Sequence, residues 1–416
     1  GNFKVFTSGN TQLNSYKLNA VFNKNGKKSL IGKGTLLGLD QKPRLDLDLV
    51  FDEFDLKFLT PLGKDNINNV RGIARGEINL WGPLDGLMHR GGLKIDNAGF
   101  TVPSLNTDYQ FENGTSIGLI DQKFEIKSAR IVDTKFDTQA SLSGVFQHQK
   151  FKDWSLNMKV DSDRILMLNL PEDEERVFYG DGFLNGSVNL IGPAKNLTID
   201  VVGSTEEGTN IKIPWADDYG LADTSFIKFI DKSVKLKKEN ATAFTLDEFR
   251  GLQMNFELDI KPNAEVEIVI DKESGSYLRG SGAGSILMEI NNKGEFNMWG
   301  DFITYEGIYN FKNLSVIDKK FNLKQGGTIV WEGNPLSAQM DMVAVYEVPG
   351  GANPALLLDN PNFNKKIPTE VLIRLQGSLL KPDDPVFEID FPNASGIVTS
   401  EINYRLSDPQ VSQLQA

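Results

Sequence analysis

Cysteine is absent from the 416-residue sequence, and histidine occurs only twice. Without Cys the chain can form no disulfide, no thiolate metal site and no cysteine nucleophile. His89 and His148 lack the HxxxH or HxH spacing that would bring two imidazoles onto one metal ion. We therefore expect both histidines to be surface residues, and we expect no metal or other cofactor.

Long hydrophobic runs are missing as well. No stretch of about 18 apolar residues could cross a bilayer as a helix, and the opening GNFKVF does not have the pattern expected of a signal peptide. Because the sequence begins without Met, in strand-like sequence, we expect it to be a piece of a longer protein. Acidic residues outnumber basic ones by 56 to 44, and a net charge of −12 argues against a nucleic-acid partner, which requires clustered Lys and Arg.

What the sequence does contain is alternation of apolar and polar residues, interrupted by Gly, Asn and Asp turns. Residues 44–51, 252–260, 265–270 and 285–290 are examples. Alternation with period two predicts β-strands with one apolar face, and the lack of long segments of period 3.6 excludes βαβ units. We predict an all-β fold of mostly antiparallel strands.

The strongest alternation lies in residues 327–348, GTIVWEGNPLSAQMDMVAVYEV, which predict a hairpin with one apolar face and a turn at Gly-Asn-Pro. A weak repeat extends this pattern. GEINLWGPLDGL at 76–87 recurs as GSVNLIGPAKNL at 186–197, and 327–338 is a looser third copy. Each copy reads as a strand, a Gly that accepts positive φ, and a Pro that prevents the strand from continuing.

Two regions interrupt the pattern and suggest a division into segments 1–203, 204–250 and 251–416. The middle segment contains a Pro-Trp loop and a predicted short amphipathic helix near 223–232, which either covers one end of a core or acts as a movable plug. The Pro- and Asn-rich residues 349–368 predict a long loop without an assigned role.

The apolar strand faces need a cover, and the sequence supplies neither enough helix nor an obvious second sheet. A curved sheet forming an elongated trough would shield these faces and leave a hydrophobic lumen; an ordinary closed sandwich is the alternative. The side chains expected to line the lumen are Leu252, Met254, Phe256, Leu258, Ile260, Val266, Ile268, Ile270, Ile286, Met288, Ile290, Phe321, Leu323, Ile329, Trp331, Met340, Met342, Tyr346, Ile373 and Leu375.

Catalytic motifs are weak throughout. GSGAG at 280–284 leads into an alternating strand rather than a helix, so glycines that permit a bend or a close sheet contact explain it better than a phosphate site does. No nucleophile, base and orienting group assemble in the sequence. We expect a protein that is not an enzyme.

The order of KPNAEVEIVID, GSGAG, GEFNMWGDF, GIYNF and WEGNP within 252–335 resembles the C-terminal domain of the TamB family, relatives of the AsmA-like proteins. The resemblance covers about 205–416, and GTNIKIPWADD with DTSFIKFI is similar to the Bacteroidetes branch.

This resemblance implies a β-taco, a long curved sheet in the periplasm of Gram-negative bacteria. It further implies an inner-membrane anchor in parts of the chain not present here and an Omp85-family, TamA-like partner in the outer membrane. The implied function is transport of phospholipid between the two membranes in support of outer-membrane biogenesis. The alternative is a scaffold that guides outer-membrane β-barrel proteins through its sheet edges.

Overall fold

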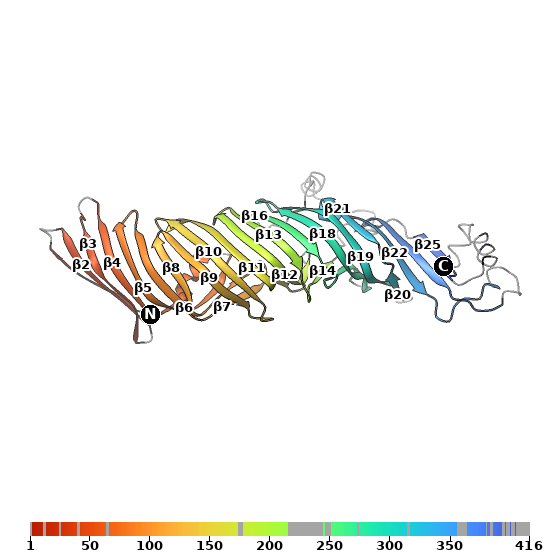
Figure 1. The fold of residues 1–416 in the computed structure, drawn as a ribbon, viewed down its shortest axis with the longest axis horizontal. Helices are drawn as coiled ribbons and strands as arrows, with labels where there is room; N and C mark the ends of the chain where they lie inside the picture. Colours follow the sequence, from red (N-terminus) through yellow and green to blue (C-terminus); the bar gives the residue numbers. More distant parts are fainter. Residues whose placement is uncertain are drawn as a thin grey trace, which may run out of the picture.

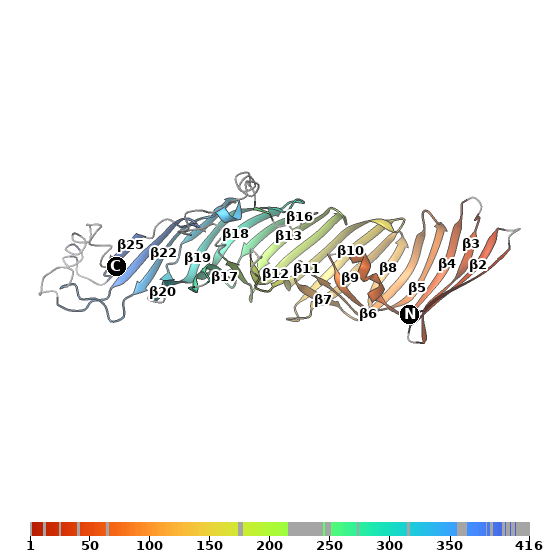
Figure 2. The ribbon, with the colours of Figure 1, turned by 180° about the vertical axis from the view of Figure 1, so that it is seen from behind.

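The computed structural model of the chain is one long, curved β-sheet (Figures 1 and 2). Strands β2 and β3 lie at one end of the elongated body and β25 lies at the other. The prediction of an elongated, mostly antiparallel all-β fold is confirmed. The structure describes residues 2–10, 14–24, 26–39, 42–63, 66–173, 178–214, 244–245, 251–272, 274–313, 317–355, 364–379, 381–382, 386–392, 396, 400 and 404.

The N-terminal half of the sheet is built from long strands joined by short turns. In chain order these are β1 (Asn2–Asn10), β2 (Ser15–Lys24), β3 (Lys27–Leu37), β4 (Arg44–Asp55), β5 (Asn68–Pro83), β6 (Met88–Val102), β7 (Thr107–Phe111), β8 (Thr115–Asp121), β9 (Lys123–Asp133), β10 (Gln139–Gln149), β11 (Lys152–Leu170), β12 (Tyr179–Pro193), β13 (Leu197–Thr205) and β14 (Asn210–Pro214). A 3₁₀ turn, η1 (Leu56–Leu59), and one helical turn, α1 (Thr60–Gly63), connect β4 to β5.

The C-terminal half continues the same sheet. Its strands are β15 (Phe244–Thr245), β16 (Leu252–Ile260), β17 (Glu265–Asp271), β18 (Ser276–Ile290), β19 (Glu295–Asn313), β20 (Ile317–Leu323), β21 (Thr328–Gly333), β22 (Gln339–Glu347), β23 (Glu370–Ser378), β24 (Lys381–Pro382) and β25 (Val386–Asp390). The 3₁₀ turn η4 (Pro335–Ser337) joins β21 to β22, so the predicted hairpin at 327–348 is confirmed, with Ile329 opposite Met340.

Neighbouring strands pair antiparallel along the sheet except at one joint. There β13 pairs parallel with β16, with Leu197 opposite Leu252, and β14 pairs parallel with β17. Pro214 and Leu252 therefore lie at opposite ends of the paired strands. The joint connects the predicted segments 1–203 and 251–416 through strand pairing, and the division into three segments stays a prediction.

The internal repeat corresponds to a recurring strand end. Gly82, Gly192 and Gly333 have φ of +113°, +117° and +123°. The turn closes in the same way in all three copies, since the backbone N–H groups of Gly86, Asn196 and Ser337 each donate to the carbonyl three residues earlier. The prediction of a glycine with positive φ, after which the strand ends, is confirmed.

Polar side chains pair with one another across the convex face, which we call the outer face. On β4 and β5 the Asn79 amide donates to Asp46 and Asp48 at 2.8 and 2.9 Å, while the Arg75 guanidinium contacts Glu53 and Asp96. Such exposed pairs contribute little stability individually, but they fix which strand residues stand opposite one another.

Two expectations concern segments that the structure covers in part or not at all. The predicted helix near 223–232 lies outside the described residues, as do 356–363 of the predicted loop 349–368. Across the described ranges, no helix has the length and hydropathy needed to cross a bilayer.

Gly76 offers a test of how closely the strands approach. Its φ is +145°, and a Cβ there would lie 2.2 Å from the carbonyl oxygen of Gly92 on the next strand. Gly76→Ala should therefore lower the free energy of unfolding by about 1–3 kcal/mol, measured by urea denaturation.

Gly118→Ala is the matched control, because the nearest atom to a Cβ at Gly118 is 3.8 Å away. Equal stability of the two variants would contradict the proposed close approach.

Candidate functional site: the inner face of the sheet

Strand registers determine which side chains share the concave face, which we call the inner face. Leu258 on β16 stands opposite Ile286 on β18, and Ile286 stands opposite Gly300 on β19, which pairs with Trp331 on β21. A second row contains Phe256, Met288 and Met298 and is continued by Gly333. Tracing the registers in this way places nineteen of the twenty predicted lumen residues on one face, and Ile270, which falls in the register shift of β17, packs against the same cluster.

The C-terminal part of the inner face is packed into a closed cluster. Eight predicted residues are buried in it: Ile268, Phe321, Leu323, Ile329, Met340, Met342, Ile373 and Leu375. Four more pack against it: Ile260, Ile270, Trp331 and Tyr346. In this part the side chains cover one another, as they do in an ordinary protein core.

The middle of the inner face is less completely covered. Met254 and Ile290 are buried beside Phe296, whereas Leu252, Phe256 and Met288 pack against them and stay half-buried. Of the other predicted residues here, Ile286 is buried and Leu258 and Val266 are half-buried. Apolar side chains in this part therefore keep surface that other protein atoms do not cover.

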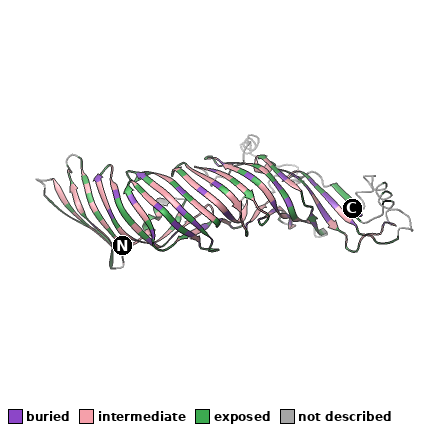
Figure 3. Ribbon diagram, viewed as in Figure 1, coloured by how far each residue is buried: buried purple, intermediate pink, exposed green. Residues whose placement is uncertain are grey.

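Coverage is high again in a second buried cluster on β7 and β9 to β13, and it is lowest on β1 to β4 (Figure 3). Among the described residues of β1 to β4, no hydrophobic side chain is fully buried. The inner-face residues Leu45, Leu47 and Leu49 of β4 are half-buried, and Phe3 and Val5 of β1 are 59% and 52% exposed. The same alternating pattern thus gives a closed core at one end and an open apolar surface at the other.

The sequence reading missed the inner-face residues of the N-terminal half and of β19. A second buried cluster includes Ile126, Leu142, Met158, Val188 and Val201, all on strands with clear alternation that could have identified them.

In β19 the signal is broken by a bulge. Phe302 and Tyr309 are both buried on the inner face, although they are an odd number of residues apart. The register with β18 shifts between Ser281 and Gly282, so the spacing of two is lost there.

The expectation that His89 and His148 lie on the surface is wrong. Both are buried, 1% and 2% exposed, and their Nε2 atoms are 3.0 Å apart. Pairing of β6 with β8, β8 with β9 and β9 with β10 brings them together. Aromatic rings surround the pair, including Phe124 at 4.6 Å from His89 and Phe151 at 4.1 Å from His148, measured between ring centroids.

Hydrogen bonds assign the protons of the neutral pair. The backbone N–H of Phe151 donates to His148 Nδ1 at 3.0 Å, so neutral His148 carries its proton on Nε2. That Nε2–H donates to His89 Nε2, which leaves the His89 proton on Nδ1, a buried atom with no hydrogen-bond partner among the described residues. In this state neither ring offers a free lone pair to a metal ion, and the described residues include no group of three or more metal-ligating side chains.

Burial sets the protonation behaviour of the pair. Desolvation, reinforced by the neighbouring His148, lowers the pKa of His89 to about 4, and desolvation also lowers the pKa of His148. A folded-state pKa below the unfolded value means that the unfolded chain binds more protons as the solution becomes acidic. The stabilisation is complete above about pH 6.5 and is lost as the pH falls toward 4.

We predict that the free energy of unfolding decreases between pH 7.5 and pH 5, by roughly 2 kcal/mol for a single histidine shifted as far as His89. These are the only histidines in the chain, so no other imidazole contributes in this range. Urea denaturation at a series of pH values measures the effect. In His89→Phe the decrease should be smaller, and a flat profile for the unchanged protein would contradict the buried neutral pair.

Comparison with known proteins identifies a family to which this sheet belongs. The family model described as the TamB C-terminal domain matches residues 127–415, so the match begins well before the 205–416 over which the sequence resemblance was noted. The match supports the family, and the Bacteroidetes branch stays a prediction. No curated protein matches the chain. A match over this share of the sequence shows that the chain belongs to the TamB family of non-enzymatic transport and assembly proteins, which serve outer-membrane biogenesis in the cell envelope, generally with TamA.

Proposed function

We propose that the inner face carries the acyl chains of phospholipids across the periplasm, between the inner and outer membranes. The observation that supports this function is a long apolar face whose side chains remain half-buried around Met288 and on β1 to β4. Leu252, Phe256 and Met288 in the middle, and the leucines of β4 nearer the N-terminal end, would be the contact surface. Family membership supports the same function, because it places the chain in outer-membrane biogenesis.

The energetic argument concerns the water between the membranes. Removing two acyl chains of about 15 methylenes each from water is worth about 24 kcal/mol at ~0.8 kcal/mol per methylene. A free phospholipid would have to overcome that free energy to cross. The inner face is about as apolar as the bilayer interior, so transfer onto it changes the free energy little, and a lipid can move along it without being trapped.

The closed C-terminal cluster imposes a condition on this function. An acyl chain can enter that part only if side chains move away from one another. Met340 and Met342 lie in the cluster, and Met is unbranched and adapts its shape more readily than Leu or Ile. The second buried cluster, on β7 and β9 to β13, imposes the same condition. We therefore expect lipid in the isolated chain to occupy the surface around Met288 and the strands β1 to β4.

The alternative function is that of a scaffold for outer-membrane β-barrel proteins. Strand β25 supports this alternative, because it pairs with β23 and with no second strand among the described residues, and its Val386 is 57% exposed. An exposed strand edge can accept a strand of another protein. A partner of the Omp85 family would bind such an edge, and the two functions are separated by whether the purified chain carries lipid.

The first test is mass spectrometry of organic extracts from the chain purified without detergent. We expect phospholipid in the extract of the unchanged protein. Met288→Asp should remove it while the fold is retained, because Met288 is half-buried and a carboxylate there can still reach water. Circular dichroism and size-exclusion chromatography check the fold.

Leu287→Asp is the matched control. Leu287 is the preceding residue, points to the outer face and is 52% exposed, so this variant should keep its lipid. A lipid-free, stable and monodisperse unchanged protein would refute the conduit and favour the scaffold.

Met340→Asp tests the closed cluster separately. Met340 is 6% exposed, and a buried unpaired carboxylate is strongly destabilising, by about 3 kcal/mol or more. We expect a large decrease in the urea midpoint for Met340→Asp and a small one for Met288→Asp. Similar midpoints for the two variants would contradict the difference in packing.

A further inference from the structure

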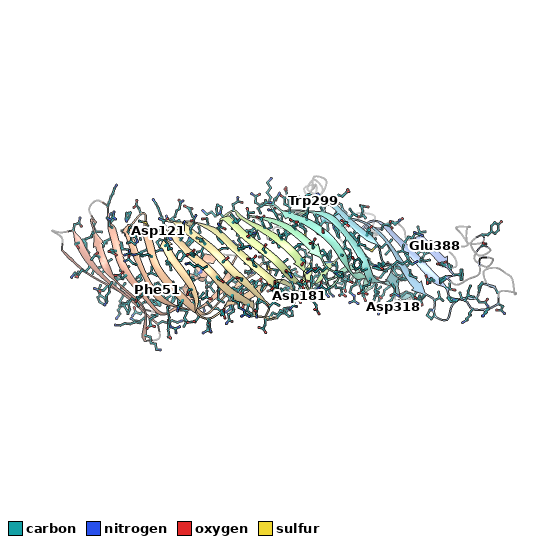
Figure 4. All side chains as sticks on the ribbon, in the orientation of Figure 1. Phe51, Asp121, Asp181, Trp299, Asp318 and Glu388 are labelled. Carbon is teal, nitrogen blue, oxygen red and sulfur yellow. The ribbon has the colours of Figure 1, made fainter. Side chains whose placement is uncertain are left out.

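An exposed apolar cluster lies on the outer face of β18, β19 and β21, where the sheet should be polar. It consists of Leu287, Trp299, Ile303, Tyr305 and Val330, which are between 38% and 52% exposed. Trp299 is at the upper long edge of the body in Figure 4. Large apolar side chains gathered on the solvent face of a sheet are typical of interaction surfaces, whereas single ones need no explanation.

Strand registers show that the cluster is contiguous. Leu287 stands opposite Trp299, and Val330 stands opposite Asp301, between Trp299 and Ile303 along β19. Directly opposite residues such as Leu287 and Trp299 have Cβ atoms about 5 Å apart, and diagonal neighbours such as Val330 and Trp299 are about 7–8 Å apart, still within reach of large side chains. Tyr305 follows Ile303 two residues later along β19. The side chains therefore form one patch rather than scattered contacts.

Three carboxylates border this patch, and a fourth, Asp301, lies within it between Trp299 and Ile303. Glu257 stands opposite Leu287, and Glu332 stands opposite Trp299, so one row reads acid, apolar, apolar, acid across four strands. Asp259 and Asp301 flank Ser285 in the next row. All four are exposed, and none forms an ion pair with a described residue.

A shallow hollow of about 380 Å³ lies among these residues. Its lining includes Asp259, Ala283, Ser285, Asp301 and Ile303. Ser285 Oγ donates to Asp259 Oδ1 at 2.7 Å, and the neighbouring Asp301 is exposed to solvent. The apolar patch and its carboxylates thus adjoin this shallow hollow.

The charges decide among possible occupants. A second copy of this chain placed on the patch through a twofold axis would bring two sets of these carboxylates together, which is unfavourable. An anionic membrane surface and a nucleic acid would be repelled for the same reason. A protein segment that presents Lys or Arg beside apolar side chains has complementary charge and polarity.

We propose that the patch formed by Leu287, Trp299, Ile303, Tyr305 and Val330, with Glu257, Asp259 and Glu332 at its border and Asp301 within it, docks a basic amphipathic segment of a partner protein. Trp299 is the anchor, because Trp residues in such surfaces contribute disproportionately to binding. The carboxylates select the partner by charge and make binding weaker at high salt.

The probe is a fluorescein-labelled amphipathic 15-residue peptide of Lys and Leu, with a matched Glu and Leu peptide as its negative counterpart. Fluorescence anisotropy with the full chain should show binding of the Lys peptide that weakens with added NaCl, and no binding of the Glu peptide. Trp299→Ser should raise the Kd about tenfold or more. Asp301→Asn with Glu332→Gln should raise it and reduce its dependence on salt.

Ile120→Ser on β8 and Glu77→Gln on β5 are the controls, since both residues are exposed on the outer face away from the patch. Equal effects of Trp299→Ser and Ile120→Ser would overturn the proposal, as would equal binding of both peptides.

Residues 223–238 of this chain contain five lysines among apolar residues. If the peptide binds only after these lysines are changed to Gln, the patch is occupied by residues 223–238 of this chain, and the proposal of a partner protein is overturned. The lipid content of Trp299→Ser should equal that of the unchanged protein, so the outcome is independent of the proposed transport function.

Discussion

Register is the constraint on which the rest of this structure depends. Because strand side chains alternate with period two, a slip of one residue between two neighbours would exchange their faces. The sheet keeps apolar residues opposite apolar residues through its antiparallel pairs and also through the parallel joint, where Ile199 stands opposite Met254. Where the register shifts, as between Phe51 and Phe54, the extra residues form a local bulge. Phe51 before the bulge and Phe54 after it both point to the inner face.

Preserving the register produces a continuous apolar face, but it does not decide how well that face is covered. Leu47 and Ile373 are both inner-face residues of alternating strands, yet the first is half-buried and the second is 2% exposed. The difference comes from what lies across the concave side. At the C-terminal end, side chains of several strands meet in one cluster, whereas among β1 to β4 they do not. A trough and a closed core are therefore two outcomes of one pattern.

The distinction between register and coverage explains which features of the structure could be predicted from the sequence. Alternation, turn residues and the repeated strand end depend on neighbours in the sequence, so the hairpin at 327–348, the turn glycines and the shared face of nineteen of the twenty residues were predictable. Burial depends on curvature and on contacts between distant strands, which no local pattern records. The resemblance to the family was carried by residues 252–335, and the matching region extends much further toward the N-terminus.

The histidine pair shows the same limit more sharply. His89 and His148 are 59 residues apart and have no spacing that predicts contact. The intervening strand pairings bring them together, and the rings of Phe124, Phe151 and Trp154 pack against them. The spacing of the two histidines in the sequence excluded a local metal-binding motif, but it could not exclude a buried contact between them. The expectation that two isolated histidines lie on the surface was wrong for this reason.

Alternation also separates the two proposed activities of the molecule. Leu287 and Met288 are adjacent in the chain, yet one belongs to the outer patch and the other to the inner face. A partner held at the outer patch and an acyl chain on the inner face would be separated by the thickness of one sheet, so neither needs to displace the other. A partner could therefore stay bound during transport, and an effect of either on the other would have to pass through the backbone of β18 and β19.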